Sequence, residues 1–199
     1  MQRLIASIGF LLILAVHTRA QDCCKRGELF GSFSYFSASS KTDRIPEKLD
    51  FKGRISQRGY GADLAYNFKK KWAFVADFSQ QMRDEKINGL NADTTTYNYL
   101  FGLRLAPQED GFSPFAEALV GASRRKTIIE DLRISNTDFA LGFGAGGDIR
   151  AGRNFAVRIF RFDYIPIRGG DDATGVGRRW SQNFRAQVGI LFRFGPLIQ

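Results

Sequence analysis

The chain has 199 residues, which suits one domain or a small barrel and excludes two full domains. A hydrophobic content of 44% is ordinary for a globular protein, and a transmembrane β-barrel gives the same average because lipid-facing apolar residues alternate with polar ones. The 19 Phe and 21 Gly favour sheet surfaces and tight turns over helices, and the formal net charge is +9.

The first twenty residues have the pattern of a secretory signal peptide. Arg3 gives a positive start, residues 4–16 are apolar, and Thr18-Arg19-Ala20 ends on a small residue. A membrane-spanning helix is the alternative, but the apolar run is shorter than the ~20 residues that cross a bilayer. We expect cleavage after Ala20, which places the mature chain outside the cytoplasm.

Cleavage after Ala20 would remove His17, the only histidine of the chain. Without histidine, the mature protein has no Ser-His-Asp or Cys-His mechanism and no imidazole for zinc, so no catalytic, cofactor or metal site is predicted. Cys23 and Cys24 are adjacent, so they bridge each other only with strain. We expect an unpaired N-terminal segment there, with a lipid-anchored cysteine as the alternative.

Beyond residue 20, apolar residues recur at every second position in eight separate runs, which predicts eight β-strands. In the seventh run, Arg158 and Arg161 are three positions apart and cannot share a face of a regular strand, so we predict a β-bulge near Ile159 and Phe160. The predicted strands are residues 28–37, 57–68, 72–81, 95–105, 114–123, 137–149, 155–166 and 182–194.

Long and short connections alternate between these strands. The long connections are 38–56, 82–94, 124–136 and 167–181, which is typical of a membrane barrel with long extracellular loops and short periplasmic turns. Because lipid cannot satisfy an open sheet edge, the sheet must close. The sequence therefore predicts an all-β, eight-stranded, antiparallel up-and-down transmembrane β-barrel. Its domains are a signal peptide (1–20), a periplasmic segment (21–27), the barrel (28–195) and a tail (196–199).

Charged residues recur on the non-aromatic faces of the predicted strands. An Arg on the lipid face near the midplane would cost ~2–4 kcal/mol, so we expect these charges to point inward and to pair. The main interpretation is a structural plug of the lumen; alternatives are a narrow path gated by the ion pairs and, least favoured, catalytic carboxylates. The predicted interior network is Glu28, Asp63, Asp77, Arg104, Glu117, Asp148, Arg158, Arg161, Asp163, Arg185 and Arg193.

Two other patterns carry weaker hypotheses. The segment 142–147 has the GxGxxG spacing of dinucleotide sites, but a polar turn and a strand follow it rather than a helix. Inward glycines that leave room for Arg and Tyr side chains explain it better. Basic clusters occur at 69–71, in a short periplasmic turn, and in two predicted extracellular loops that could meet lipopolysaccharide phosphates. The predicted lipopolysaccharide contacts are Arg124, Arg125, Lys126, Arg178 and Arg179.

Several stretches together resemble small outer-membrane β-barrel proteins related to the membrane domain of outer membrane protein A and to opacity-type surface proteins. The resemblance implies a bacterial outer-membrane location and recognition of the last strand by the outer-membrane assembly machinery, although residues 195–199 follow the terminal Phe194. The peptidoglycan-binding domain of larger members is absent from the chain. The matching stretches are 28–35, 72–78 (WAFVADF), 99–104 (YLFGLR), 155–164 and 184–195 (FRAQVGILFRFG).

The function expected from these patterns is a structural or surface-interaction role through the extracellular loops, without catalysis. A small channel with a charge-gated lumen and a soluble lipocalin-like binding barrel are the alternatives. The expected partners are outer-membrane lipid and lipopolysaccharide, and the chain is expected to be a monomer. Nucleic-acid binding is not expected for an exported chain whose aromatic residues face lipid. No recognised motif in the loops identifies a ligand.

Overall fold

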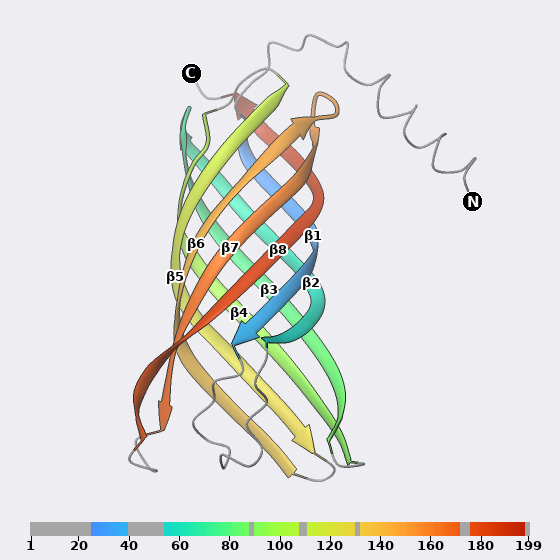
Figure 1. Ribbon diagram of the computed structural model, residues 1–199. Coiled ribbons are helices and arrows are strands. Elements are labelled where there is room, and N and C mark those ends of the chain that lie inside the picture. Colours follow the sequence, from blue (N-terminus) through green and yellow to red (C-terminus); the bar gives the residue numbers. More distant parts are fainter. Residues whose placement is uncertain are drawn as a thin grey trace, which may run out of the picture.

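A computed structural model describes residues 25–39, 54–87, 90–107, 111–129, 132–171 and 176–197. The predicted signal peptide and both cysteines lie outside these residues. Each strand pairs antiparallel with the next, and β1 pairs with β8, so the sheet closes into the predicted eight-stranded barrel (Figure 1). The strands are β1 (Lys25–Ser39), β2 (Arg54–Lys69), β3 (Trp72–Ile87), β4 (Leu90–Leu105), β5 (Phe112–Ile129), β6 (Leu132–Arg150), β7 (Phe155–Asp171) and β8 (Val176–Leu197).

The two-residue alternation of the sequence decides which side chains face outward. In β2, Tyr60 and Leu64 are 66% and 52% exposed, whereas Asp63 between them is 1% exposed. The same alternation places large apolar side chains such as Phe101 and Phe162 on the outside and polar ones within the barrel. The outside is therefore the apolar surface and the inside the polar one. Among the described residues, no helix is long and apolar enough to span a membrane.

Three of the four predicted long loops are wrong, because the strands continue through most of them. β3 runs to Ile87 and β4 starts at Leu90, β5 and β6 are separated by residues 130–131, and β7 and β8 by 172–175. The apolar alternation ends earlier, since side chains beyond the apolar surface have no reason to be apolar, while the backbone pairing continues regardless of side-chain type. The connections at the other end are short: 70–71, 106–111 and 151–154. The loop predicted at 38–56 falls mainly on residues outside the described ones.

These extended strands form an open sheet beyond the barrel. Pairing of β2 with β3 begins at Arg58 and Met82, and pairing of β6 with β7 begins at Phe139 and Arg168. Between these limits, β3–β4, β4–β5 and β5–β6 remain paired almost to their tips. We call this part the protruding sheet; it comprises residues 83–87, 90–96, 124–129 and 132–138. In Figure 1 it lies at the bottom, at the end opposite to the start of β1 and the end of β8.

The predicted β-bulge in β7 is confirmed. Arg158 pairs with Gly189 and Arg161 with Gln187, so three steps along β7 correspond to two along β8. The bulge takes up one extra residue, so Arg158 and Arg161 both point inward although they are three positions apart. Both arginines are fully buried inside the barrel.

Deleting Phe160 tests what the bulge does. With Phe160 deleted, Arg158 and Arg161 are two positions apart and share the inner face of a regular strand, so the bulge is no longer needed. We expect this variant to fold into phospholipid vesicles about as well as the wild type, measured as the fraction of heat-sensitive, faster-migrating protein on gels. Deleting Phe162 instead makes Arg161 and Asp163 adjacent, so one of the two charges points toward lipid, at a cost of about 2–4 kcal/mol for an arginine, and the variant should fold poorly. Poor folding of the Phe160 deletion together with normal folding of the Phe162 deletion would contradict a bulge that sets the alternation.

Candidate functional site

The interior of the barrel holds a network of charged side chains contributed by all eight strands. The structure places all eleven predicted network residues inside, none more than 7% exposed. They comprise six carboxylates and five guanidinium groups, and no other charged side chain within the described part of the chain is buried. Buried charges of this number require mutual pairing, because each isolated ion would cost several kcal/mol in desolvation.

Arg161 lies at the centre of the network and contacts four carboxylates. Its Nε donates to Asp163 at 2.9 Å, Nη1 donates to Asp63 at 2.9 Å, and Nη2 lies 2.9 Å from Asp77. Nη2 also forms an ion pair with Glu117. The planar guanidinium directs its donors outward in a fixed fork, which suits bonding to carboxylates on several strands at once. One side chain therefore connects β2, β3, β5 and β7 across the lumen.

Asp63 is the reciprocal centre. Its carboxylate accepts hydrogen bonds from Arg104 at 2.7 Å, Arg158 at 3.1 Å and Arg161 at 2.9 Å. Arg104 also donates to Glu117 at 2.9 Å. Three guanidinium groups around one carboxylate repel each other, so their arrangement depends on the carboxylates that separate them.

The network extends toward both ends of the barrel from this centre. Toward the protruding sheet, Arg185 binds both carboxylate oxygens of Asp77, at 2.8 and 2.9 Å, and donates to Asp163 at 2.8 Å. Toward the termini, Arg158 binds both oxygens of Asp148, at 2.7 and 3.1 Å. Arg193 and Glu28 form the last pair, 3.2 Å apart.

Two aromatic rings pack against the arginines, a feature that the sequence analysis did not predict. The Arg158 guanidinium lies 4.3 Å from the ring centre of Phe30 and 4.2 Å from that of Phe115. Arg104 lies 4.8 Å from the Phe115 ring. Arginine stacks well on aromatic faces, so these rings cover the apolar planes of the guanidinium groups without competing for their donors. Both Phe residues lie at inward positions of the alternation in their strands. That position could have predicted from the sequence that the two rings point into the barrel.

Inward glycines make room for the acids. A Cβ on Gly144 would lie 2.2 Å from Asp163 Oδ1 and 3.0 Å from Glu117, and one on Gly146 would lie 2.4 Å from Phe115. The GxGxxG segment is thus part of strand β6. The side chains that occupy the space are carboxylates and Phe, rather than the Arg and Tyr that the sequence suggested.

Between the charged network and the protruding sheet, the lumen is lined by neutral polar and apolar side chains. Asn98 donates to Gln81 at 2.9 Å, and Gln187 donates to Ser32 at 2.9 Å. Phe36 and Leu100 are fully buried at this level, so the packing is tight. These neutral residues also lie at the inward positions of the alternation, although only the charged residues were predicted to form the interior site. Buried side chains fill the interior at both levels.

Of the predicted lipopolysaccharide contacts, Arg124, Arg125 and Lys126 do not share one face of the sheet. Residues 124–126 lie in β5 rather than in a loop, so Arg124 and Lys126 are exposed on the outer face while Arg125 shares the face of the buried Glu117. The Lys126 ammonium lies 5.3 Å from the Tyr97 ring centre. Arg133 of β6 is also exposed. The side chains of Arg178 and Arg179 lie outside the described ones.

The closed sheet, apolar outside and charged inside, defines a transmembrane β-barrel, the reverse of a soluble barrel such as a lipocalin. The sequence matches the family described as outer membrane protein beta-barrel domain over residues 7–194, and the chain belongs to that family. It is therefore a bacterial outer-membrane β-barrel. Because short turns of outer-membrane barrels face the periplasm, we expect the protruding sheet to lie on the extracellular side.

Solved structures of similar fold include three small outer-membrane barrels. Neisserial surface protein A is 12% identical with a TM-score of 0.62, covering 84% of this chain and 97% of that protein. Ail, the attachment invasion locus protein of Yersinia pestis, is 20% identical with a TM-score of 0.53, covering 85% and 99%. The N-terminal barrel of Pseudomonas aeruginosa OprF is 12% identical with a TM-score of 0.51, covering 85% and 98%. The comparison with curated proteins finds no match.

Replacing Arg161 by Met tests whether the network holds the barrel together. Removing one partner of a buried ion pair leaves uncompensated charges and typically costs about 3–5 kcal/mol. We expect Arg161→Met to lower the free energy of unfolding by about that amount, measured by urea unfolding in vesicles through tryptophan fluorescence. Arg124→Met, which removes an exposed arginine of another strand, should change it by less than about 0.5 kcal/mol.

A double variant separates charge balance from packing. In Arg161→Met with Asp63→Asn, one charge of each sign is removed, so the loss should be smaller than the sum of the two single losses. Additive losses would show that the two residues act independently and would contradict the network.

Proposed function

We propose that this protein is an outer-membrane barrel with a closed interior, a structural or surface-interaction role and no catalysis, exported by an N-terminal signal peptide. The protruding sheet carries this proposal. Its strands stay paired beyond the apolar surface, and its β3 and β6 edges have no neighbouring strand within the described part of the chain. Such edges can bind other macromolecules, because a strand edge without a neighbouring strand presents main-chain donors and acceptors for pairing.

The absence of catalysis is supported by the state of the acidic groups. Every buried carboxylate lies against at least one guanidinium group, as Asp63 and Asp148 do, and none of the six is more than 6% exposed. A general acid or base must reach its substrate within hydrogen-bonding distance, which buried, paired carboxylates do not offer. The loss of His17 with the signal peptide would remove the commonest acid–base group.

The partner that the surface favours is the phosphate-rich face of lipopolysaccharide. Arg124 and Lys126 on β5 and Arg133 on β6 lie on the outer face of the protruding sheet. Ail, whose fold is similar, has been solved in complex with the heparin analogue sucrose octasulfate, a polyanion. That complex supports the proposal that a barrel of this fold can bind an anionic group. Further partners would be the lipid around the barrel and the outer-membrane assembly machinery, which would recognise β8. The barrel would be a monomer.

Conductance separates the closed barrel from the channel alternative. Buried arginines such as Arg161 and Arg185 fill the lumen, so the wild-type protein should give no reproducible discrete conductance steps in planar bilayers. A general porin added to the same bilayers is the positive control. Regular steps from the wild-type protein would overturn the closed interior and favour a channel gated by the ion pairs.

Charge reversal tests the lipopolysaccharide contact. The variant Arg124→Glu, Lys126→Glu, Arg133→Glu should be retained at least ten-fold less on immobilised lipopolysaccharide at low salt, because each basic side chain near an anionic surface contributes about 1 kcal/mol. The difference should shrink as salt is added. Reversing Lys69, Lys70 and Lys71 at the periplasmic end changes the net charge equally and should have little effect. Equal losses of retention in the two variants would show that binding depends on the net charge of the protein rather than on the protruding sheet.

A further inference from the structure

A hollow of about 350 Å³ lies on the outer wall of the barrel, over β1, β2 and β3. Phe33, Tyr60 and Met82 line it with side chains that are 48%, 66% and 42% exposed. Arg58 and Ser56 line its remaining side. The hollow is at the low end of ligand-pocket volumes, enough for the part of a lipid next to its headgroup rather than for a whole lipid.

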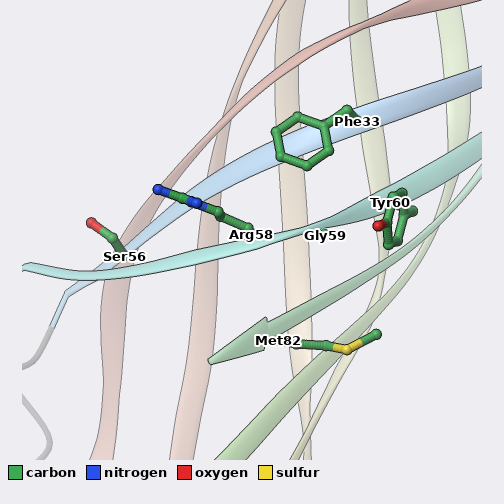
Figure 2. Close-up of a pocket in the computed structure, with 6 residues that line it drawn as sticks. All are labelled: Phe33, Ser56, Arg58, Gly59, Tyr60 and Met82. Carbon is green, nitrogen blue, oxygen red and sulfur yellow. The ribbon is translucent and has the colours of Figure 1, made fainter. Parts of the chain in front are cut away.

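The lining has a polar end and an apolar end. Figure 2 shows the Arg58 side chain extended toward Ser56 and away from Tyr60, while Phe33, Tyr60 and Met82 surround the other part of the hollow. The Ser56 hydroxyl is held 2.5 Å from the Tyr35 hydroxyl on the neighbouring strand. Phe33 and Tyr60 meet edge to face, with ring centres 6.1 Å apart. The apolar end is thus braced by an aromatic pair, and the polar end by a hydrogen bond between β1 and β2.

The position of the hollow relative to the membrane indicates its environment. Below Arg58, the outward residues of β2 are apolar as far as Phe68, so this wall faces lipid. Arg58 is the first outward cation above that surface and pairs in register with Tyr35 and Met82. An arginine at this depth costs little free energy, because the guanidinium reaches the headgroup region.

We propose that this hollow binds one phosphate-bearing, acylated lipid of the outer leaflet, the chemistry of the lipopolysaccharide anchor. Arg58 pairs with the phosphate, the Ser56 hydroxyl donates to a phosphate or sugar oxygen, and an acyl chain packs on Phe33, Tyr60 and Met82. The proposed lipopolysaccharide contact would thus extend from the protruding sheet to the lipid-facing wall. The identity of the lipid in the hollow rests on that proposed function.

Site-specific photocrosslinking in the outer membrane tests this site. The full chain, with Met82 replaced by p-benzoylphenylalanine, is expressed in a Gram-negative host and irradiated, and adducts with lipopolysaccharide are detected by immunoblot. We expect an adduct whose yield falls about five-fold on Arg58→Ala, the change that about 1 kcal/mol per basic residue at an anionic surface predicts. Arg58→Lys keeps the charge and should retain most of the adduct.

Two controls distinguish a site from ordinary lipid contact. The same probe at Phe101, an exposed apolar position on β4, should give adducts that Arg58→Ala does not change. Arg168→Ala removes an exposed arginine on β7, between Phe139 and Trp180 in register, and should leave the Met82 adduct unchanged. All variants are checked for folding by heat-dependent gel migration, which an exposed arginine should not alter.

Three outcomes would overturn the proposal: a Met82 adduct that Arg58→Ala leaves unchanged, an adduct with phospholipid instead of lipopolysaccharide, or equal losses at Met82 and Phe101. The first and third would reduce the hollow to general lipid contact, and the second would assign it to another lipid. Reversing Arg124, Lys126 and Arg133 should leave the Met82 adduct in place. Failure of the protruding-sheet contact is therefore distinguishable from failure of this site.

Discussion

The contact between Arg161 and Asp63 in the middle of the barrel is the interaction on which the other features of the interior depend. Arg161 contacts Asp63, Asp77, Glu117 and Asp163, and Asp63 contacts three arginines, so the two residues connect five of the eight strands across the lumen. Because the outer wall is apolar and meets lipid, charged residues of these strands have no place except the interior. Once inside, they are stable only when paired, and this pairing fixes which strand faces which across the barrel. The bulge in β7 follows from the same requirement, since Arg158 and Arg161 are three positions apart and would face opposite sides of a regular strand.

The sequence was informative wherever a single physical rule decides the outcome. Lipid on one side and a filled lumen on the other force every second side chain to be apolar, so the positions of Tyr60 and Asp63 could be predicted from alternation alone. The bulge could be predicted because the three-residue spacing of Arg158 and Arg161 violates that rule. Which acid meets which arginine could not be predicted, because the shear of the barrel brings together residues as distant as Asp63 and Arg161, and alternation along a strand contains no information about it. The stacking of Phe30 and Phe115 on Arg158 depends on the same long-range geometry.

The strand ends were mispredicted for a related reason. The apolar alternation reports contact with lipid, not backbone pairing, and the two coincide only within the membrane. Above it, β5 continues through Arg124, Arg125 and Lys126 with its ladder intact, paired to β4 and β6. The consequence for function is that these cations sit on a paired backbone with fixed directions. Arg124 and Lys126 face outward and Arg125 does not, so the charge presented to the exterior depends on strand phase rather than on the number of basic residues.

The same phase argument connects the interior with the lipid-facing hollow. In β2, the outward positions include Arg58, Tyr60 and Leu64, and the inward positions include Asp63; a shift of one residue would exchange the two sets. Arg58 is thus held at the membrane rim by the register that places Asp63 within reach of Arg161. An isolated exposed arginine on a flexible loop would approach phosphates at any depth, whereas this one is fixed above Tyr60, on a strand whose phase is set by a buried ion pair. A rigid wall with a cation at headgroup depth and aromatic side chains below it distinguishes lipids by the distance between phosphate and acyl chain. The protruding sheet alone would provide only general charge attraction, which does not make that distinction.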